Sequence, residues 1–227
     1  MRRVTGVLRH PRAMMAEVVQ HPAFVTTWVL VLLVVAVCGG LLLSTPIGQQ
    51  ALIDERVRVT EALVGRVDDA AYDRLRSDPP VFIYLTSGGQ LLLTPPITLV
   101  MAAGLMALAR FDGARVTFVT ALAIAVHATV VLAVQQVVAA PLHYVNESLT
   151  SPTNLAGMLR VFNEGSVPAR LLGTIDVFGL WWTWLLAVGL AAATGRPARQ
   201  YIWRLLAVYI GVAALVAAVF AVLGDAL

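Results

Sequence analysis

The sequence predicts an all-α polytopic membrane protein, with five transmembrane helices in one bundle and short amphipathic helices in the loops. Five apolar stretches are each about as long as the roughly 20 residues that a helix needs to cross a bilayer. Of the 227 residues, 59% are hydrophobic and only 13% are charged, against ~25% charged in an average soluble domain. Because lipid offers the backbone no hydrogen-bond partners, stretches of this length must be helical.

The apolar stretches place the spans at residues 24–44, 81–109, 116–140, 171–194 and 201–223. The first stretch is longer than the ~7–15-residue apolar core of a cleaved secretory signal, so we expect it to be retained as a span. The other segments are of loop size. Residues 23–227 are therefore expected to form one membrane domain, preceded by a cytoplasmic tail at residues 1–22.

The tail has apolar residues at near-helical spacing between four arginines, which are Arg2, Arg3, Arg9 and Arg12. This pattern is typical of a cationic amphipathic helix that lies on an anionic membrane surface. The alternative is a basic tail that only sets the topology of the chain.

Two longer connections, at residues 45–80 and 141–170, are expected outside the membrane. Residues 49–75 have a polar helical pattern that ends at Asp78-Pro79-Pro80, because proline has no amide hydrogen for a helix. This helix either caps the bundle or binds a partner. In the second connection, Ser151-Pro152-Thr153-Asn154 suits the start of a short interfacial helix.

The arginines also predict the orientation. Arg110 and Arg115 lie in the second connection, and Arg196 and Arg199 lie in the fourth. In a five-span chain these connections are on the same side as the N-terminus. The positive-inside rule assigns that side to the cytoplasm, so we expect the N-terminus inside and the C-terminus outside.

Four polar residues inside the expected spans form a candidate site, because intramembrane polar groups are costly and often functional. Asp176 is near the outer end of the fourth span, at a level that matches Gln135 and Gln136, and Gln90 is in the outer half of the second span. These residues form either a hydrogen-bonded lock between helices, which we favour, or a polar site for a transported substrate or proton.

Two further features of the spans have mainly structural interpretations. Pro95 and Pro96 deprive two carbonyls of their helical donors and predict a static kink in the second span. His127 lies near the middle of the third span with no second histidine three or four residues away. We expect a hydrogen-bonded packing role for it and no metal site.

The sequence offers no catalytic residues and no cofactor motif. It has no His-Glu-x-x-His pattern, and Cys38 is its only cysteine. We therefore expect no enzymatic activity, no cofactor and no metal. The expected partners are the lipid bilayer and either other proteins or further copies of the chain, and no nucleic acid.

Three stretches resemble the Yip family, the Ypt- and Rab-interacting integral membrane proteins, in its bacterial branch. Residues 94–105 are a proline-bearing span followed by small residues. Residues 151–155 read Ser-Pro-Thr-Asn-Leu, and residues 175–190 begin Ile-Asp-Val-Phe-Gly-Leu-Trp. The resemblance covers the chain after about residue 20 and implies a five-span domain with a cytoplasmic N-terminus, here in a bacterial cytoplasmic (inner) membrane.

The resemblance implies a family whose eukaryotic members associate with small Rab-type GTPases and act in vesicle budding and fusion. This chain departs from them, since its N-terminal tail is short and we expect no extended cytosolic domain. The resemblance implies no catalytic residues. The leading hypothesis is a non-enzymatic scaffold or adaptor that acts through protein or lipid contacts in membrane organisation. The alternative is a small transporter or channel subunit that uses the Gln/Asp cluster.

Overall fold

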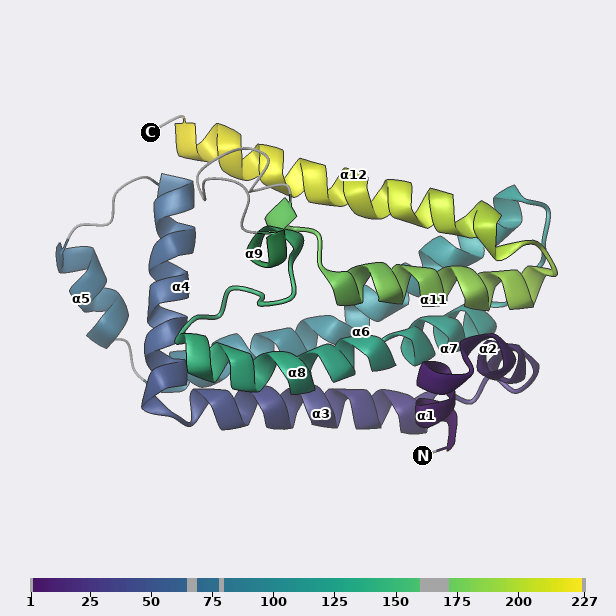
Figure 1. Cartoon of the computed structure of the whole chain (residues 1–227), viewed down its shortest axis with the longest axis horizontal. Helices are drawn as coiled ribbons and strands as arrows, with labels where there is room; N and C mark the ends of the chain where they lie inside the picture. Colours follow the sequence, from purple (N-terminus) through teal and green to yellow (C-terminus); the bar gives the residue numbers. More distant parts are fainter. Residues whose placement is uncertain (1, 65–68, 78–79, 160–171, 226–227) are drawn as a thin grey trace. The chain divides into compact units, whose positions relative to one another are not determined.

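The computed structural model describes residues 2–64, 69–77, 80–159 and 172–225 (Figure 1). Within these described residues, five helical segments are long and apolar enough to cross a membrane, so the expected all-α, five-span class is confirmed. In chain order the helices are α1 (Arg2–Arg9), α2 (Pro11–Gln20), α3 (Val25–Leu43), α4 (Pro46–Val64), α5 (Asp69–Ser77), α6 (Pro80–Phe111), α7 (Phe118–Ala128), α8 (Val130–Asn146), α9 (Leu155–Leu159), α11 (Val177–Thr194) and α12 (Ala198–Asp225).

Some span boundaries differ from the expected ones. The third span is divided at Thr129, whose hydroxyl donates to the Val126 carbonyl at 2.7 Å, and it runs to Asn146 where we expected residue 140. The fourth begins only at Val177, because Asp176 is held beside Asn154 in an isolated bridge. Helix α6 continues through both of its internal prolines, and whether it bends there remains a prediction.

The chain packs into two compact units, which are described separately. Unit 1 consists of Met1–Val35, Gln90–Gln135 and Phe178–Tyr209, and therefore contains a segment of every span. Unit 2 consists of Ala36–Gly89, Gln136–Val177 and Ile210–Leu227.

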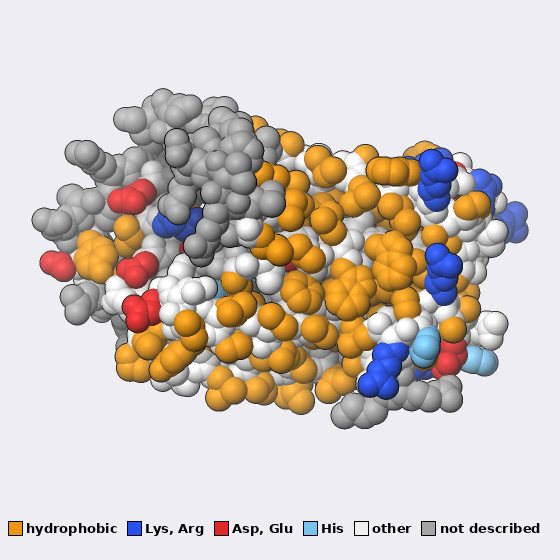
Figure 2. Space-filling view, in the orientation of Figure 1, with side chains coloured by type: hydrophobic (Ala, Val, Ile, Leu, Met, Phe, Trp, Pro, Cys, Tyr) orange, Lys and Arg blue, Asp and Glu red, His pale blue; other side chains and the backbone are white. Residues whose placement is uncertain are grey.

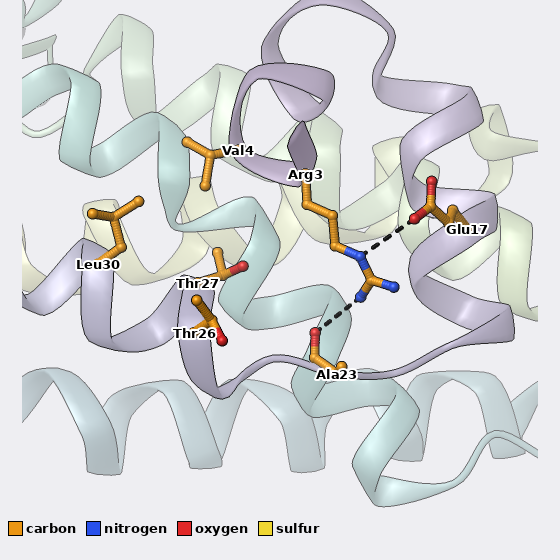
Figure 3. A pocket seen from close by; sticks show the side chains of 7 residues that line it. All are labelled: Arg3, Val4, Glu17, Ala23, Thr26, Thr27 and Leu30. Carbon is orange, nitrogen blue, oxygen red and sulfur yellow. Dashed lines mark hydrogen bonds and ion pairs between the residues drawn. The ribbon is translucent and has the colours of Figure 1, made fainter. Parts of the chain in front are cut away.

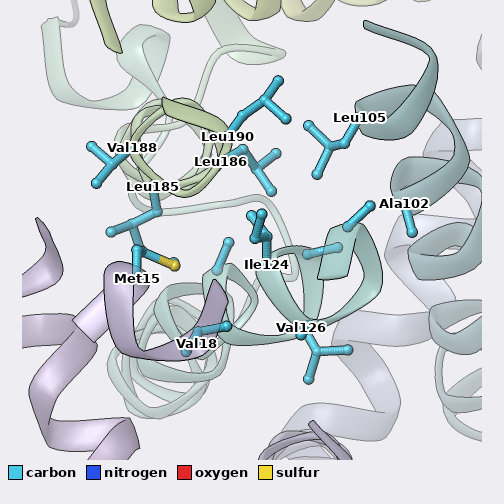
Figure 4. Close-up of a cluster of buried hydrophobic side chains, with 14 of the residues drawn as sticks. Met15, Val18, Ala102, Leu105, Ile124, Val126, Leu185, Leu186, Val188 and Leu190 are labelled. Carbon is cyan, nitrogen blue, oxygen red and sulfur yellow. The ribbon is translucent and has the colours of Figure 1, made fainter. Parts of the chain in front are cut away.

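Helix α7 is the centre of unit 1. Every residue from 121 to 130 is buried. In the first span, by contrast, only 11% of the residues are buried. Figure 4 shows side chains of α2, α6 and α11 gathered around Ile124 of α7; these side chains include Met15, Leu105 and Leu186. Between lipid-immersed helices such contacts stabilise mainly by close packing, since lipid is as apolar as the side chains.

The N-terminal segment belongs to this core. Val7, Met15 and Val18 are each 0% exposed, and both α1 and α2 contact α7. The apolar side of the amphipathic pattern therefore packs on protein. Residues 2–20 form two helices that cover one end of unit 1.

In unit 2, a tight corner joins α3 to α4. The Thr45 hydroxyl donates to the Leu42 carbonyl at 2.6 Å and accepts from the Gly48 amide at 3.0 Å. A Cβ atom at Gly48 would overlap the Leu42 carbonyl, so this corner requires glycine. Further along α4, Gln50 Nε2 lies 3.3 Å from the Tyr72 hydroxyl of α5.

Candidate functional site

One end of unit 1 gathers arginine side chains beyond the apolar surface, as Figure 2 shows. At this end lie the N-terminal helices and the α6–α7 and α11–α12 connections (Figure 1). We call it the basic end and define it by its exposed arginines, which are Arg9, Arg12, Arg110, Arg115, Arg196, Arg199 and Arg204. The three segments that the positive-inside argument placed on one side thus meet in the folded unit.

Arg3 fixes the N-terminal helices to the start of the first span (Figure 3). Its Nη1 donates to the carbonyls of His21 and Ala23, each at 3.0 Å, and its Nε lies 3.4 Å from Glu17 Oε1. Beside this ion pair is an open pocket of about 350 Å³. Its lining residues are Arg3, Val4, Glu17, Ala23, Thr26, Thr27 and Leu30.

Thr27 connects this pocket to His127 of α7. The Thr27 hydroxyl lies 3.2 Å from His127 Nε2, and His127 Nδ1 lies 2.8 Å from the Ala123 carbonyl. A carbonyl can only accept, so Nδ1 carries a proton, and in the neutral ring Nε2 accepts from Thr27. His127 is thus hydrogen-bonded and buried, as expected, and its packing role remains a prediction. Its partner lies 100 residues away in the sequence, which is why sequence reasoning missed it.

Replacing Thr27 with valine is expected to destabilise the protein by about 1–2 kcal/mol, as His127 Nε2 loses its donor. Both side chains are buried, at 5% and 0% exposure. Thermal unfolding in detergent measures the loss. The double variant Thr27→Val/His127→Leu should recover part of the lost stability, because its side chain at position 127 has no polar ring atom that needs a partner. A Thr27→Val protein that melts like the wild type would show that this bond contributes nothing.

A second polar cluster ties together two connections of the basic end. Arg204 Nη1 donates to both carboxylate oxygens of Asp112 at 2.8 Å, and Arg196 donates to the Asp112 carbonyl oxygen. Nearby, the buried Tyr201 donates to Thr194 Oγ1 at 3.1 Å. Asp112 thus clamps the α6–α7 connection to the α11–α12 connection.

Turns at both connections depend on glycine. Gly113 has φ of +74° and Gly195 has φ of +69°, in the left-handed region that glycine enters without steric cost. Gly113 directly follows Asp112 and lets the chain reverse so that the carboxylate meets Arg204.

Asp112 should make the stability of the protein sensitive to acid. The hydrogen bond from Arg204 lowers the pKa of Asp112 below its ordinary value of 3.8. Because the folded-state pKa is the lower one, the stabilisation is complete above about pH 4 and is lost as the pH falls through the folded pKa. The two arginine side chains are 42% and 44% exposed, so solvent screening keeps the effect small.

The measurement is thermal unfolding of wild type and Asp112→Asn between about pH 5 and pH 3. Wild type should lose more stability over this range than the variant, which has no carboxylate to protonate. Parallel curves for the two proteins would contradict the clamp.

In unit 2, Asp176 is held by a turn of the preceding connection. Asp176 Oδ2 accepts from the Ser151 hydroxyl at 2.7 Å and from the Thr153 hydroxyl at 2.6 Å. Backbone bonds reinforce the contact, from the Leu155 amide to the Ile175 carbonyl and from the Val177 amide to the Thr153 carbonyl. Asp176 directly precedes α11, where a negative charge interacts favourably with the helix dipole.

A family model of the Yip1 domain matches residues 5–221. The chain belongs to the Yip1 family. Neither the curated proteins nor the solved structures contain a match to it. The Asp176 contact joins two of the stretches on which the resemblance rested, residues 151–155 and 175–190, so this part of the Yip1 domain is one local structure.

The polar residues expected to form one cluster are distributed over both units of the Yip1 domain. Asp176 and Gln136 belong to unit 2, and Gln90 and Gln135 belong to unit 1. Gln135 and Gln136 are half-buried on α8. The hydroxyl partners of Asp176 were not foreseen, although Ser151 and Thr153 were noted as a helix start. The four-residue cluster remains a prediction.

The N-terminal arginines of the Yip1 domain have different surroundings. Arg3 is engaged in the contacts described above, whereas Arg9 and Arg12 are exposed; the side chain of Arg2 lies outside what the structure describes. Contact of Arg9 and Arg12 with anionic lipid remains a prediction. In the described part of the chain, no three His, Cys, Asp or Glu side chains are grouped to hold a metal ion.

Proposed function

We propose that this Yip1-family membrane protein is a non-enzymatic scaffold or adaptor that acts through protein or lipid contacts in membrane organisation. The observation that carries the proposal is the construction of the basic end. Its exposed arginines stand on helices and connections that Arg3 and Asp112 hold in place. A charged surface that is ordered in advance binds a partner with a smaller entropic cost.

The surroundings of the polar groups favour this role over the transport alternative. Asp176 accepts from two hydroxyls of its own chain, and His127 bonds to Thr27 and Ala123. Such internal bonds are typical of residues that hold helices together. The scaffold proposal therefore treats both residues as structural.

Photocrosslinking in native membranes tests the scaffold role. The chain has no lysine, so amine-reactive crosslinkers are unsuitable. A photoreactive residue is placed at Ala13, which is exposed on α2 of the basic end, and as a control at Ala70, which is exposed on α5. A discrete set of proteins captured from Ala13 and absent from Ala70 is expected.

The transport alternative makes the opposite prediction. Purified protein in proteoliposomes would then carry a substrate-dependent flux, and Asp176→Asn would abolish it without lowering thermal stability. That result, together with identical captures from Ala13 and Ala70, would overturn the scaffold proposal.

The proposed orientation places the basic end in the cytoplasm of a bacterium, with the C-terminus outside. Reporters that are active on only one side of the membrane are fused after Gly113 and after Leu227. We expect the first to report a cytoplasmic location and the second an external one, as the arginine distribution requires. Signals from the same side for both fusions would contradict five spans with this orientation.

A further inference from the structure

The end of α6 and the α6–α7 connection carry two arginines beside an open pocket of about 530 Å³. Its lining residues are Arg110, Gly113, Ala114, Arg115, Val116 and Thr117. Both arginines are exposed, and within the described residues neither of them takes part in a salt bridge. The pocket therefore has two positive charges at its rim.

The one carboxylate of this connection is committed elsewhere. Asp112 lies between the two arginines in sequence, yet its side chain is only 8% exposed and pairs with Arg204 of α12. Gly113, with its positive φ, makes the reversal that turns Asp112 away. The clamp therefore leaves Arg110 and Arg115 without a neutralising neighbour on their own connection.

The surroundings of the pocket are those of a bilayer interface. The second span ends at Phe111, whose side chain is 88% exposed between Arg110 and Asp112. Earlier on α6, Ile97 and Val100 are 59% and 73% exposed, as expected for a lipid-facing helix. An exposed apolar ring next to Arg110 in the chain, at the end of a lipid-facing helix, suits a ligand with an anionic group next to an acyl chain.

We propose that Arg110 and Arg115 bind the phosphate of an anionic phospholipid, with Phe111 against its glycerol and acyl region. Guanidinium groups match phosphate oxygens in charge and in fork geometry, and basic pockets at the ends of transmembrane helices suit acidic headgroups. A zwitterionic headgroup would bring its own cation to a site that already has two. This site is a specific lipid contact of the scaffold proposed above and rests on that proposal.

Native mass spectrometry of the detergent-purified full chain tests the site, with phosphatidylglycerol and phosphatidylcholine of matched acyl chains as probes. Wild type should retain phosphatidylglycerol in preference to phosphatidylcholine. Arg110→Gln and Arg115→Gln should each reduce retention of phosphatidylglycerol about fivefold, as expected for the loss of one basic contact. Arg74→Gln is the matched control. It removes an exposed arginine from α5, outside the basic end, and it should leave retention unchanged.

A soluble competitor identifies the source of the phosphate group. Glycerophosphoglycerol, added at the same concentration as phosphatidylglycerol, should not displace the lipid. This competitor lacks the acyl chains that are proposed to contact Phe111. Displacement would assign the site to a soluble phosphate ester and overturn the lipid assignment. Equal retention of the two lipids by wild type, or an Arg74→Gln effect as large as that of Arg115→Gln, would overturn the site itself. Partners captured from Ala13 would in either case leave the scaffold role standing.

Discussion

Valine at position 189 is expected to lower the free energy of unfolding by about 1–3 kcal/mol, the usual cost of overpacking a filled core. Gly189 of α11 lies against Ile124 of α7. A Cβ atom at Gly189 would overlap Ile124 Cγ2 and would lie 3.3 Å from Ile124 Cβ. Ile124 is 0% exposed, so it has little room to move. Thermal unfolding in detergent should show a decrease of about 2–4 °C for each kcal/mol.

Gly104→Val is the matched control, since a Cβ atom at Gly104 of α6 would meet nothing within 4 Å. It should melt close to wild type. Ile124→Ala removes the Cγ2 atom that a Cβ at position 189 would overlap, so Gly189→Ala should cost less in an Ile124→Ala background than in wild type. If Gly189→Val and Gly104→Val melt alike, the close approach of α11 to α7 is not a requirement of the fold.

Leucine at position 176 is expected to destabilise the protein by about 2 kcal/mol, since an orphaned, partly buried polar group costs ~1–3 kcal/mol. The hydroxyls of Ser151 and Thr153 both donate to Asp176 Oδ2, and leucine offers them no acceptor. Asp176→Asn keeps one acceptor oxygen and should lose less. Thermal unfolding in detergent compares the variants.

A mutant cycle separates the hydrogen bonds from a general effect of leucine. In a Ser151→Ala/Thr153→Val background, Asp176→Leu leaves no hydroxyl without a partner and should cost much less than in wild type. The same loss in both backgrounds would show that the two hydroxyl bonds do not stabilise this junction.

For Asp176, the sequence indicated a structural role but not the two hydroxyl partners. Its position within the expected fourth span suggested a hydrogen-bonded lock with residues at the same level of the membrane, Gln135 and Gln136. The partners that the structure shows, Ser151 and Thr153, lie in the connection before α11. A connection can fold back against the end of a span, and that approach depends on the path of the backbone, which hydropathy does not describe.

The N-terminal segment is a second such case. The spacing of its apolar residues correctly indicated an amphipathic helix, and a membrane surface was the natural apolar partner. Helix α7 provides another one, with Met15 and Val18 buried beside it. An amphipathic pattern shows that one face of the helix needs an apolar partner. The pattern does not distinguish a lipid surface from a protein surface.

The sequence by itself determined the fold class, the number of spans and the gathering of arginines at one end. These follow from properties of consecutive residues, because a bilayer requires length, apolarity and internal backbone hydrogen bonding from each span. Only the tertiary structure decided the central position of α7, the clamp at Asp112 and the partners of His127 and Asp176. In lipid, apolar side chains gain little by leaving one apolar neighbour for another. Helix order and polar pairing therefore depend on shape and on a few hydrogen bonds between residues far apart in the chain.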